Sequence, residues 1–281
     1  MPSVRFLLLA VVLFIIASAT PAEEERGCYA GAGEQSVRIH GFKIRVFRHP
    51  RADQQDFLDE CQAKIKDASG RVIFSDEDHG LEILPISGTD INGDGEPDAV
   101  IEGYTGGAHC CWNYWIVSLG KHPGLLAHLY NERPASFFKM ENGQVLITTF
   151  DGRFDYFDGL SHTSSVFPRV FLRLSGKHLG EVNLEFWSTY LKDIERAEKS
   201  LATQELTEFR QNFSPHGDRF SESYEETRSK VLAIVLAYLY CGKPGEAWKA
   251  LDEMWPPEDR MRIRALILKT RGRGLADRRD N

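Results

Sequence analysis

The spacing of hydrophobic residues divides the chain into two parts. Up to about residue 175, short runs alternate between apolar and polar positions, and turn-forming residues separate them. This period of two is typical of β-strands that bury one face. The runs occupy residues 37–47, 61–74, 81–86, 98–104, 111–119, 144–150 and 168–174.

Two of these runs contain further detail. In the run that starts at residue 61, Cys61, Ala63 and Ile65 fall on one face, and the following sequence DASG predicts a hairpin turn into the next strand. Residues 42–46 alternate in the same way, and we expect Gly41 to shift the phase of that strand as a β-bulge would.

After Gly180 the apolar residues recur every three or four positions, which is typical of amphipathic helices. We expect a first helix over residues 183–213, with an apolar stripe of Leu184, Trp187, Leu191, Ile194, Ala197 and Leu201. Further helices are expected over 222–241, 245–254 and 258–271. Gly242 is placed to end the second of the four helices, and Pro256 and Pro257 separate the last two.

These patterns predict an α+β protein with two domains. A β-rich domain over residues 23–178, with a propeller-like or sandwich architecture, precedes an α-helical domain over 182–272. We expect residues 273–281 to form a disordered tail.

Residues 1–22 have the pattern of a secretory signal peptide. A charged start is followed by the apolar run FLLLAVVLFII and by the small residues ASATPA. The apolar run is shorter than the roughly 20 residues that a membrane-spanning helix needs. We therefore expect a secreted or periplasmic protein whose mature form has no membrane span.

The charge of the chain disfavours a nucleic-acid partner. Its 41 acidic residues outnumber its 34 basic residues, and the formal net charge is −7. Proteins that bind nucleic acids present an organised basic surface to the phosphates. A protein or glycan ligand is the expected partner instead.

Five cysteines lie beyond the predicted signal peptide. Cys28, Cys61, Cys110 and Cys111 allow two disulfide bonds in three connectivities, and export permits such bonds. We expect Cys28 and Cys61 each to pair with one member of the Cys110–Cys111 dipeptide, because a bond between neighbours closes a strained ring. Cys241, at the end of an apolar helix, is expected to be a buried free thiol.

Oxygen-bearing side chains recur at alternate positions in the segment DINGDGEPD, which covers residues 90–98. They belong to Asp90, Asn92, Asp94, Glu96 and Asp98. A calcium ion takes about six to eight oxygen ligands, and a tightly curled chain presents every second residue inwards. The spacing therefore predicts a calcium site, in which Glu96 offers its main-chain oxygen. An EF-hand is excluded, because Ile101 stands where that motif needs a glutamate.

The same segment resembles an FG-GAP or VCBS-type repeat. The signature of these repeats is a D-x-N-G-D-G-x-x-D loop that leads directly into an apolar strand, here DINGDGEPDAVI. The resemblance is specific over residues 88–103 and extends over about 80–175, where the segment TGGAHCCW is similar to exported members of the group. It implies a calcium-bearing, propeller-like fold, with Asp90, Asn92, Asp94 and Asp98 at the ligand positions. One such loop occurs here, whereas a closed propeller has about four to eight blades.

The alternative for the loop is an Asp/Asn/Gly turn that its own side-chain hydrogen bonds stabilise. A second acidic cluster, Asp151, Asp155 and Asp158, lacks the alternating register and is interpreted as a strand end or hairpin. The segment GGAHCCW offers another possibility, a soft-metal or redox centre made by His109, Cys110 and Cys111. Neighbouring residues on a strand point to opposite faces, which disfavours that centre.

No catalytic residues are predicted. The chain contains no H-E-x-x-H, G-x-S-x-G or Walker-type motif. His162 lies near Ser161, Ser164 and Ser165, but the sequence identifies no acid to orient it. The leading hypothesis is an exported, calcium-stabilised binding or structural module at the cell envelope. The alternative is an envelope enzyme, either a hydrolase with an interdomain site or a thiol protein that uses Cys110 and Cys111.

Overall fold

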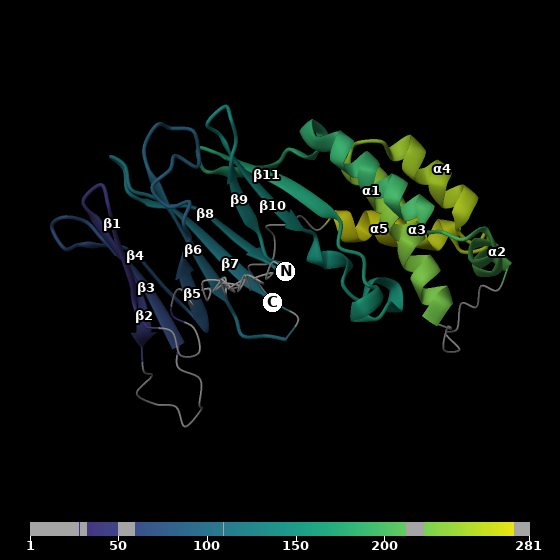
Figure 1. Ribbon diagram of the computed structural model, residues 1–281, viewed down its shortest axis with the longest axis horizontal. Coiled ribbons are helices and arrows are strands. Elements are labelled where there is room, and N and C mark those ends of the chain that lie inside the picture. The colour runs from purple at the N-terminus through teal and green to yellow at the C-terminus, as the bar shows by residue number, and fades with distance from the viewer. Residues whose placement is uncertain (1–27, 29–32, 50–59, 109, 212–221, 273–281) are drawn as a thin grey trace, which may run out of the picture.

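The computed structural model describes Cys28 and residues 33–49, 60–108, 110–211 and 222–272. The predicted signal peptide over 1–22, the predicted tail over 273–281 and His109 lie outside these residues. The described chain forms three antiparallel sheets followed by helices, which confirms the predicted α+β class with a β-rich first part and a helical second part (Figure 1).

Each sheet contains four strands, and neighbours in a sheet are consecutive in the sequence. This antiparallel meander is also the arrangement of one propeller blade. The first sheet contains β1 (Gln35–Ile39), β2 (Phe42–His49), β3 (Glu60–Lys66) and β4 (Val72–Asp78). The second contains β5 (Gly80–Ile83), β6 (Asp98–Tyr104), β7 (Trp112–Ser118) and β8 (Gly124–Asn131). The third contains β9 (Ser136–Lys139), β10 (Val145–Phe150), β11 (Arg169–Ser175) and β12 (His178–Glu181).

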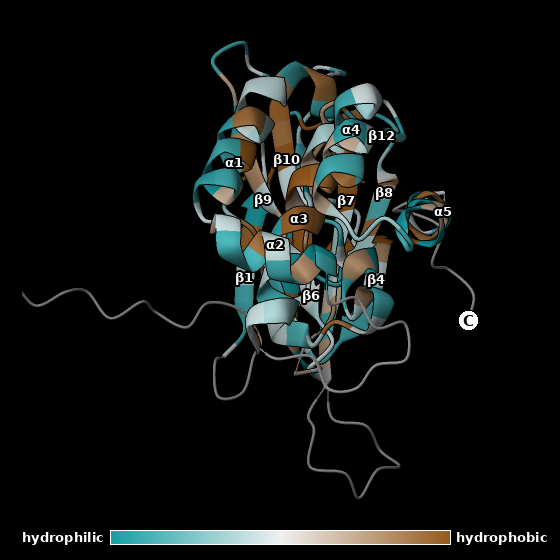
Figure 2. Ribbon diagram, turned by 90° about the vertical axis from the view of Figure 1, so that its right-hand side faces the viewer, coloured by the Kyte–Doolittle hydropathy of each residue, from teal (hydrophilic) through white to brown (hydrophobic). Residues whose placement is uncertain are grey.

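The helical part begins directly after β12. It contains α1 (Trp187–Lys199), α2 (Thr203–Gln211), α3 (Glu222–Tyr240), α4 (Pro244–Met254) and α5 (Arg260–Arg271). Short 3₁₀ turns lie at Gly152–Phe154, Phe157–Gly159, His162–Ser164 and Asn183–Phe186. Helix α3 contacts α1, α2 and α4, and in Figure 2 its hydrophobic residues lie in the middle of this group.

Alternation along the strands creates two hydrophobic cores. In the second sheet, Ala99 and Ile101 belong to one core and Val100 to the other, since successive side chains point to opposite faces. The first core joins this sheet to the first sheet, and the second joins it to the third sheet and the helices. The layers therefore follow the order of the sequence, from the first sheet at the left of Figure 1 to the helices at the right.

Two local predictions are wrong. Residues 37–47 form two strands instead of one bulged strand, because His40 and Gly41 adopt φ values of 47° and 87° and make a two-residue hairpin turn between Ile39 and Phe42. The helix expected over 183–213 is a 3₁₀ turn followed by α1 and α2, which separate around Ser200. The hairpin predicted at DASG is confirmed by the pairing of β3 with β4.

None of the helices within the described ranges is long and apolar enough to cross a membrane.

Candidate functional site

The acidic loop at residues 90–98 connects β5 to β6 at one end of the second sheet. Two backbone hydrogen bonds close its base: the Gly88 amide donates to the Asp98 carbonyl at 2.7 Å, and the Asp98 amide donates to the Thr89 carbonyl at 2.9 Å. Gly93 and Gly95 have φ values of 82° and 84°, which glycine adopts without a steric penalty. The two glycines therefore permit the tight curl that the spacing predicts.

Four of the side chains in the loop accept hydrogen bonds from loop amides, and three of them, Asp90, Asn92 and Asp94, form turns within the loop. Asp90 Oδ1 accepts from Gly93 at 2.7 Å and from Asp94 at 3.1 Å, and Asp90 Oδ2 accepts from Gly95 at 2.8 Å. Asn92 Oδ1 accepts from the Asp94 amide, and Asp94 Oδ1 accepts from the Glu96 amide. These bonds are those of an Asx turn. They leave accepting capacity on the Asp90 and Asp94 carboxylates, because an ionised carboxylate has about four lone-pair sites.

Asp98 differs from the other acids of the loop because it is completely buried. Its Oδ2 accepts a hydrogen bond from the Ile91 amide at 2.8 Å, whereas its Oδ1 is buried without any hydrogen-bond partner. Burial raises the pKa of Asp98 to about 6, and the charges of Asp94 and Asp90 add to this increase. A buried carboxylate oxygen without a partner is costly, and it marks a position that a cation would satisfy.

Asn92 ties the loop to the third sheet. Its Nδ2 donates to the Gly176 carbonyl at 3.2 Å, and its own carbonyl accepts from the Gly176 amide at 3.2 Å. Gly176 lies in the turn between β11 and β12. The loop therefore connects the second sheet to the third sheet. A ligand that fixes the conformation of the loop would also fix the contact between these two sheets.

Glu96 contacts the connection between β7 and β8. Its carboxylate pairs with Lys121 at 3.3 Å, and its side chain lies against Gly120, whose added Cβ would come within 2.6 Å of it. The donor set offered by the side chains is therefore Asp90, Asn92, Asp94 and Asp98, with Glu96 available through its main chain. As the side chains stand, no three His, Cys, Asp or Glu residues of the described chain are grouped as metal ligands.

The predicted disulfide pairing is wrong. Cys28 pairs with Cys61, their Cα atoms 5.8 Å apart, and Cys110 pairs with its neighbour Cys111. Cys28 also forms a β-bridge with Leu81 of the second sheet, so residue 28 links the first two sheets. Cys241 is a buried free thiol, as expected, and burial raises its pKa.

His162 has an acidic partner that sequence reasoning missed. Its Nδ1 lies 2.9 Å from both carboxylate oxygens of Asp155. Ser161 and Ser165 lie nearby, but their hydroxyl oxygens accept hydrogen bonds from the backbone of the same turns. Ser161 Oγ accepts from the Ser164 amide, and Ser165 Oγ accepts from the Tyr156 amide. No sequence signal identifies Asp155, because a 3₁₀ turn with Tyr156 in the left-handed region brings it back toward His162.

Comparisons with known proteins do not identify the chain. No family model, no curated protein and no solved structure matches it. The resemblance of residues 88–103 to FG-GAP or VCBS-type repeats therefore stays a prediction.

Proposed function

We propose that this protein is a calcium-stabilised binding module that works outside the cytoplasm. The observation that carries the proposal is the Oδ1 atom of Asp98, which is buried without a partner in a loop rich in carboxylates. A calcium ion would be held by the side-chain oxygens of Asp90, Asn92, Asp94 and Asp98 together with the main chain of Glu96. It would supply the charge compensation that Asp98 lacks.

Three further features support the proposal. The loop spacing matches that of FG-GAP and VCBS-type repeats, and each sheet has the strand order of a propeller blade. The Cys28–Cys61 disulfide suits an oxidising compartment, which agrees with the signal-peptide pattern of residues 1–22. The ion would act structurally, because the loop joins the second sheet to the third through Asn92 and Gly176.

Thermal unfolding in calcium and in a chelator tests the metal site. At a calcium concentration about 100 times Kd, the ion stabilises the folded state by about 2.7 kcal/mol. This corresponds to a rise in Tm of roughly 5–10 °C for a protein of this size. Asp94→Ala and Asp98→Asn should abolish the rise. Glu96→Gln should keep it, because that carboxylate pairs with Lys121.

The Asp98→Asn variant adds an internal check. In chelator it should be no less stable than the wild type, since the substitution removes a buried negative charge beside Asp90 and Asp94. In calcium it should be less stable than the wild type. Equal melting temperatures of the wild type and of Asp94→Ala in calcium and in chelator would refute the calcium site.

A second candidate function, hydrolysis, is favoured by one observation, the Asp155–His162 pair beside Ser161 and Ser165. An acid that orients a histidine is one part of a nucleophilic site. Incubation with a fluorophosphonate probe tests this function. Covalent labelling of a serine that is lost in His162→Ala would support it, and an unlabelled wild-type protein would count against a serine hydrolase.

A further inference from the structure

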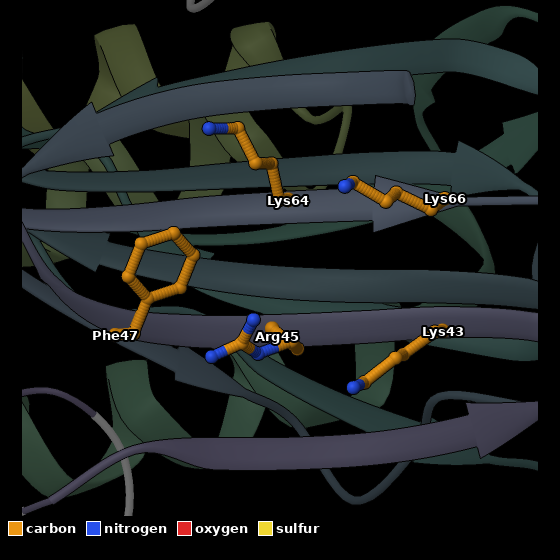
Figure 3. A pocket seen from close by; sticks show the side chains of 5 residues that line it. All are labelled: Lys43, Arg45, Phe47, Lys64 and Lys66. Atoms are coloured by element: carbon orange, nitrogen blue, oxygen red, sulfur yellow. The ribbon is translucent and has the colours of Figure 1, made fainter. Parts of the chain in front are cut away.

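The outer face of the first sheet carries a cluster of basic side chains. Strand β2 buries Ile44 and Val46 in the first core, so the residues between and beside them face outwards. Strand β3 does the same with Ala63 and Ile65. In Figure 3 the side chains of Lys43, Arg45 and Phe47 on β2 lie beside those of Lys64 and Lys66 on β3. We call Arg38, Lys43, Arg45, Lys64 and Lys66 the basic face.

The strand register places like charges directly opposite each other. Lys43 is the cross-strand partner of Lys66, and Arg45 is the partner of Lys64. Arg38 on β1 extends the first of these rows, because it is the partner of Lys43 on the other side of β2. Like charges at directly opposed positions destabilise a sheet. The first sheet therefore carries repulsion that an anion lying across the rows would relieve.

Few carboxylates neutralise this cluster. Glu34 pairs with Arg45 through two hydrogen bonds of 2.5 Å. Lys64 donates to the neutral side chain of Gln62 at 2.6 Å. In the described parts of the chain, no ion pair involves Lys43, Lys64 or Lys66. The basic face therefore contrasts with the net charge of −7 of the whole chain.

An aromatic ring lies within the cluster. The guanidinium carbon of Arg45 is 4.9 Å from the ring centroid of Phe47, and Lys64 Nζ is 5.8 Å from it. The depression formed by these side chains has a volume of about 230 Å³. This is smaller than the roughly 300–1,000 Å³ of pockets that enclose small molecules. A depression of this size suits one unit of an extended ligand that continues along the sheet.

We propose that the basic face binds an acidic polysaccharide, with its carboxylates or sulfates on the lysines and a sugar ring on Phe47. The Cβ atoms of these basic residues lie about 5 Å apart across the strands and about 7 Å apart along them, so a flexible polyanion can meet several cations at once. The C–H groups of a sugar can pack on the face of an aromatic ring such as Phe47. A bare phosphate or carboxylate has no such groups and gains nothing from the ring. The inference rests on the proposed binding role, and it names the class of ligand.

Binding to immobilised polygalacturonate, dextran sulfate and neutral dextran tests the inference, with the full-length protein as analyte. The wild type should bind one or both acidic polymers and not neutral dextran, and added salt should weaken binding. Lys66→Glu and Lys64→Glu should each weaken binding by about tenfold, because each converts an attraction into a repulsion. Lys139→Glu, the same charge reversal on an exposed position of β9, is the matched control and should bind like the wild type. Phe47→Ala should weaken binding while it leaves the salt dependence unchanged.

The stability of the variants gives an independent readout. Lys66→Glu should raise Tm by about 1–4 °C, because it places a carboxylate opposite Lys43. All variants should keep the wild-type response to calcium, so loss of polymer binding and loss of the metal site are distinguishable. The inference is overturned if the wild type binds neither acidic polymer, or if Lys139→Glu weakens binding as much as Lys66→Glu. The inference is also overturned if the wild type binds single-stranded DNA or phosphatidylglycerol vesicles more tightly than it binds either acidic polymer.

Discussion

Asp158 forms an ion-pair cluster that joins the β-rich part of the protein to the helices. Its carboxylate pairs with Arg228 of α3, and it accepts hydrogen bonds of 2.5 and 2.9 Å from the guanidinium of Arg262 of α5. The side chains of Asp158 and Arg228 are 12% and 8% exposed, whereas that of Arg262 is 50% exposed. Replacement of Asp158 would therefore remove a carboxylate that a buried guanidinium contacts.

The expected cost follows from these exposures. Loss of one partner of a buried ion pair costs about 3–5 kcal/mol, and the half-exposed Arg262 pair adds at most about 1 kcal/mol. Arg228 would still donate to the main-chain carbonyl of residue 158 at 2.5 Å, which favours the lower end of the range. We expect Asp158→Ala to lower the free energy of unfolding by about 3 kcal/mol. Asp158→Asn should cost less, because asparagine tolerates the φ of 52° at this position and keeps an acceptor.

The loss should depend on pH. Burial raises the pKa of Asp158, but its hydrogen bonds and charge interactions with Arg262 and Arg228 outweigh burial and hold the pKa below its ordinary value of 3.8. A carboxyl group whose pKa is lowered by folding contributes stability that is fully present above the unfolded pKa. That contribution disappears as the pH falls through the folded pKa. The difference between the wild type and Asp158→Asn should therefore be constant from pH 7 to about pH 5 and shrink below about pH 4.

Urea unfolding, followed by circular dichroism at pH 7, 5 and 3, measures these differences. Asp252→Asn, at an exposed position of α4, is the control and should match the wild type at every pH. A difference between the wild type and Asp158→Asn that is equally large at pH 3 and pH 7 would refute the electrostatic explanation. A cost below about 0.5 kcal/mol for Asp158→Ala would show that the cluster does not hold the two parts together.

Two further substitutions test the packing of the first two sheets. Cys28→Ser removes a disulfide that spans 33 residues and should lower the free energy of unfolding, measured in urea, by about 3–4 kcal/mol. Treatment of the wild type with a reductant should cause the same loss. If neither change lowers the free energy of unfolding, the Cys28–Cys61 bond is absent in solution. Gly103→Ala should destabilise by about 1–3 kcal/mol, because its Cβ would lie 2.7 Å from the indole of Trp115. Gly33→Ala, where no atom lies within 4 Å, should leave Tm unchanged; if both glycine variants melt alike, the close packing at residue 103 is wrong.

The strongest strand predictions concern the second sheet. DAVIEGY and WNYWIVS contain the consecutive apolar stretches AVI and YWIV, because β6 and β7 are covered on both faces. The sequence pattern gave the wrong structure where the same residues are compatible with two local conformations. A glycine between alternating residues permits either a bulge or a hairpin turn, and the positive φ of His40 selects the turn. Strands β8, β9 and β12 were not predicted, since their exposed or irregular positions obscure the alternation.

In the loop at residues 90–98, too, the sequence predicted the local conformation but not the contacts with other parts of the chain. The alternate spacing of its oxygens and the two glycines predict the curl, because both act within a few residues of chain. The sequence does not reveal that Asp98 alone is buried without a partner for Oδ1, or that Glu96 turns to Lys121. Burial depends on β6 lying inside the second sheet, and the Lys121 contact depends on the neighbouring strand connection.

The sequence by itself determined that a β-rich part precedes a helical part and that the acidic loop curls, because hydrophobic period and glycine placement act through neighbouring residues. Only the tertiary structure decided which distant groups meet. It paired Cys28 with Cys61, brought Asp155 to His162 and aligned Lys43 with Lys66. The physical reason is that such contacts depend on strand register and on turns with positive φ, where a shift of one residue moves a side chain to the opposite face.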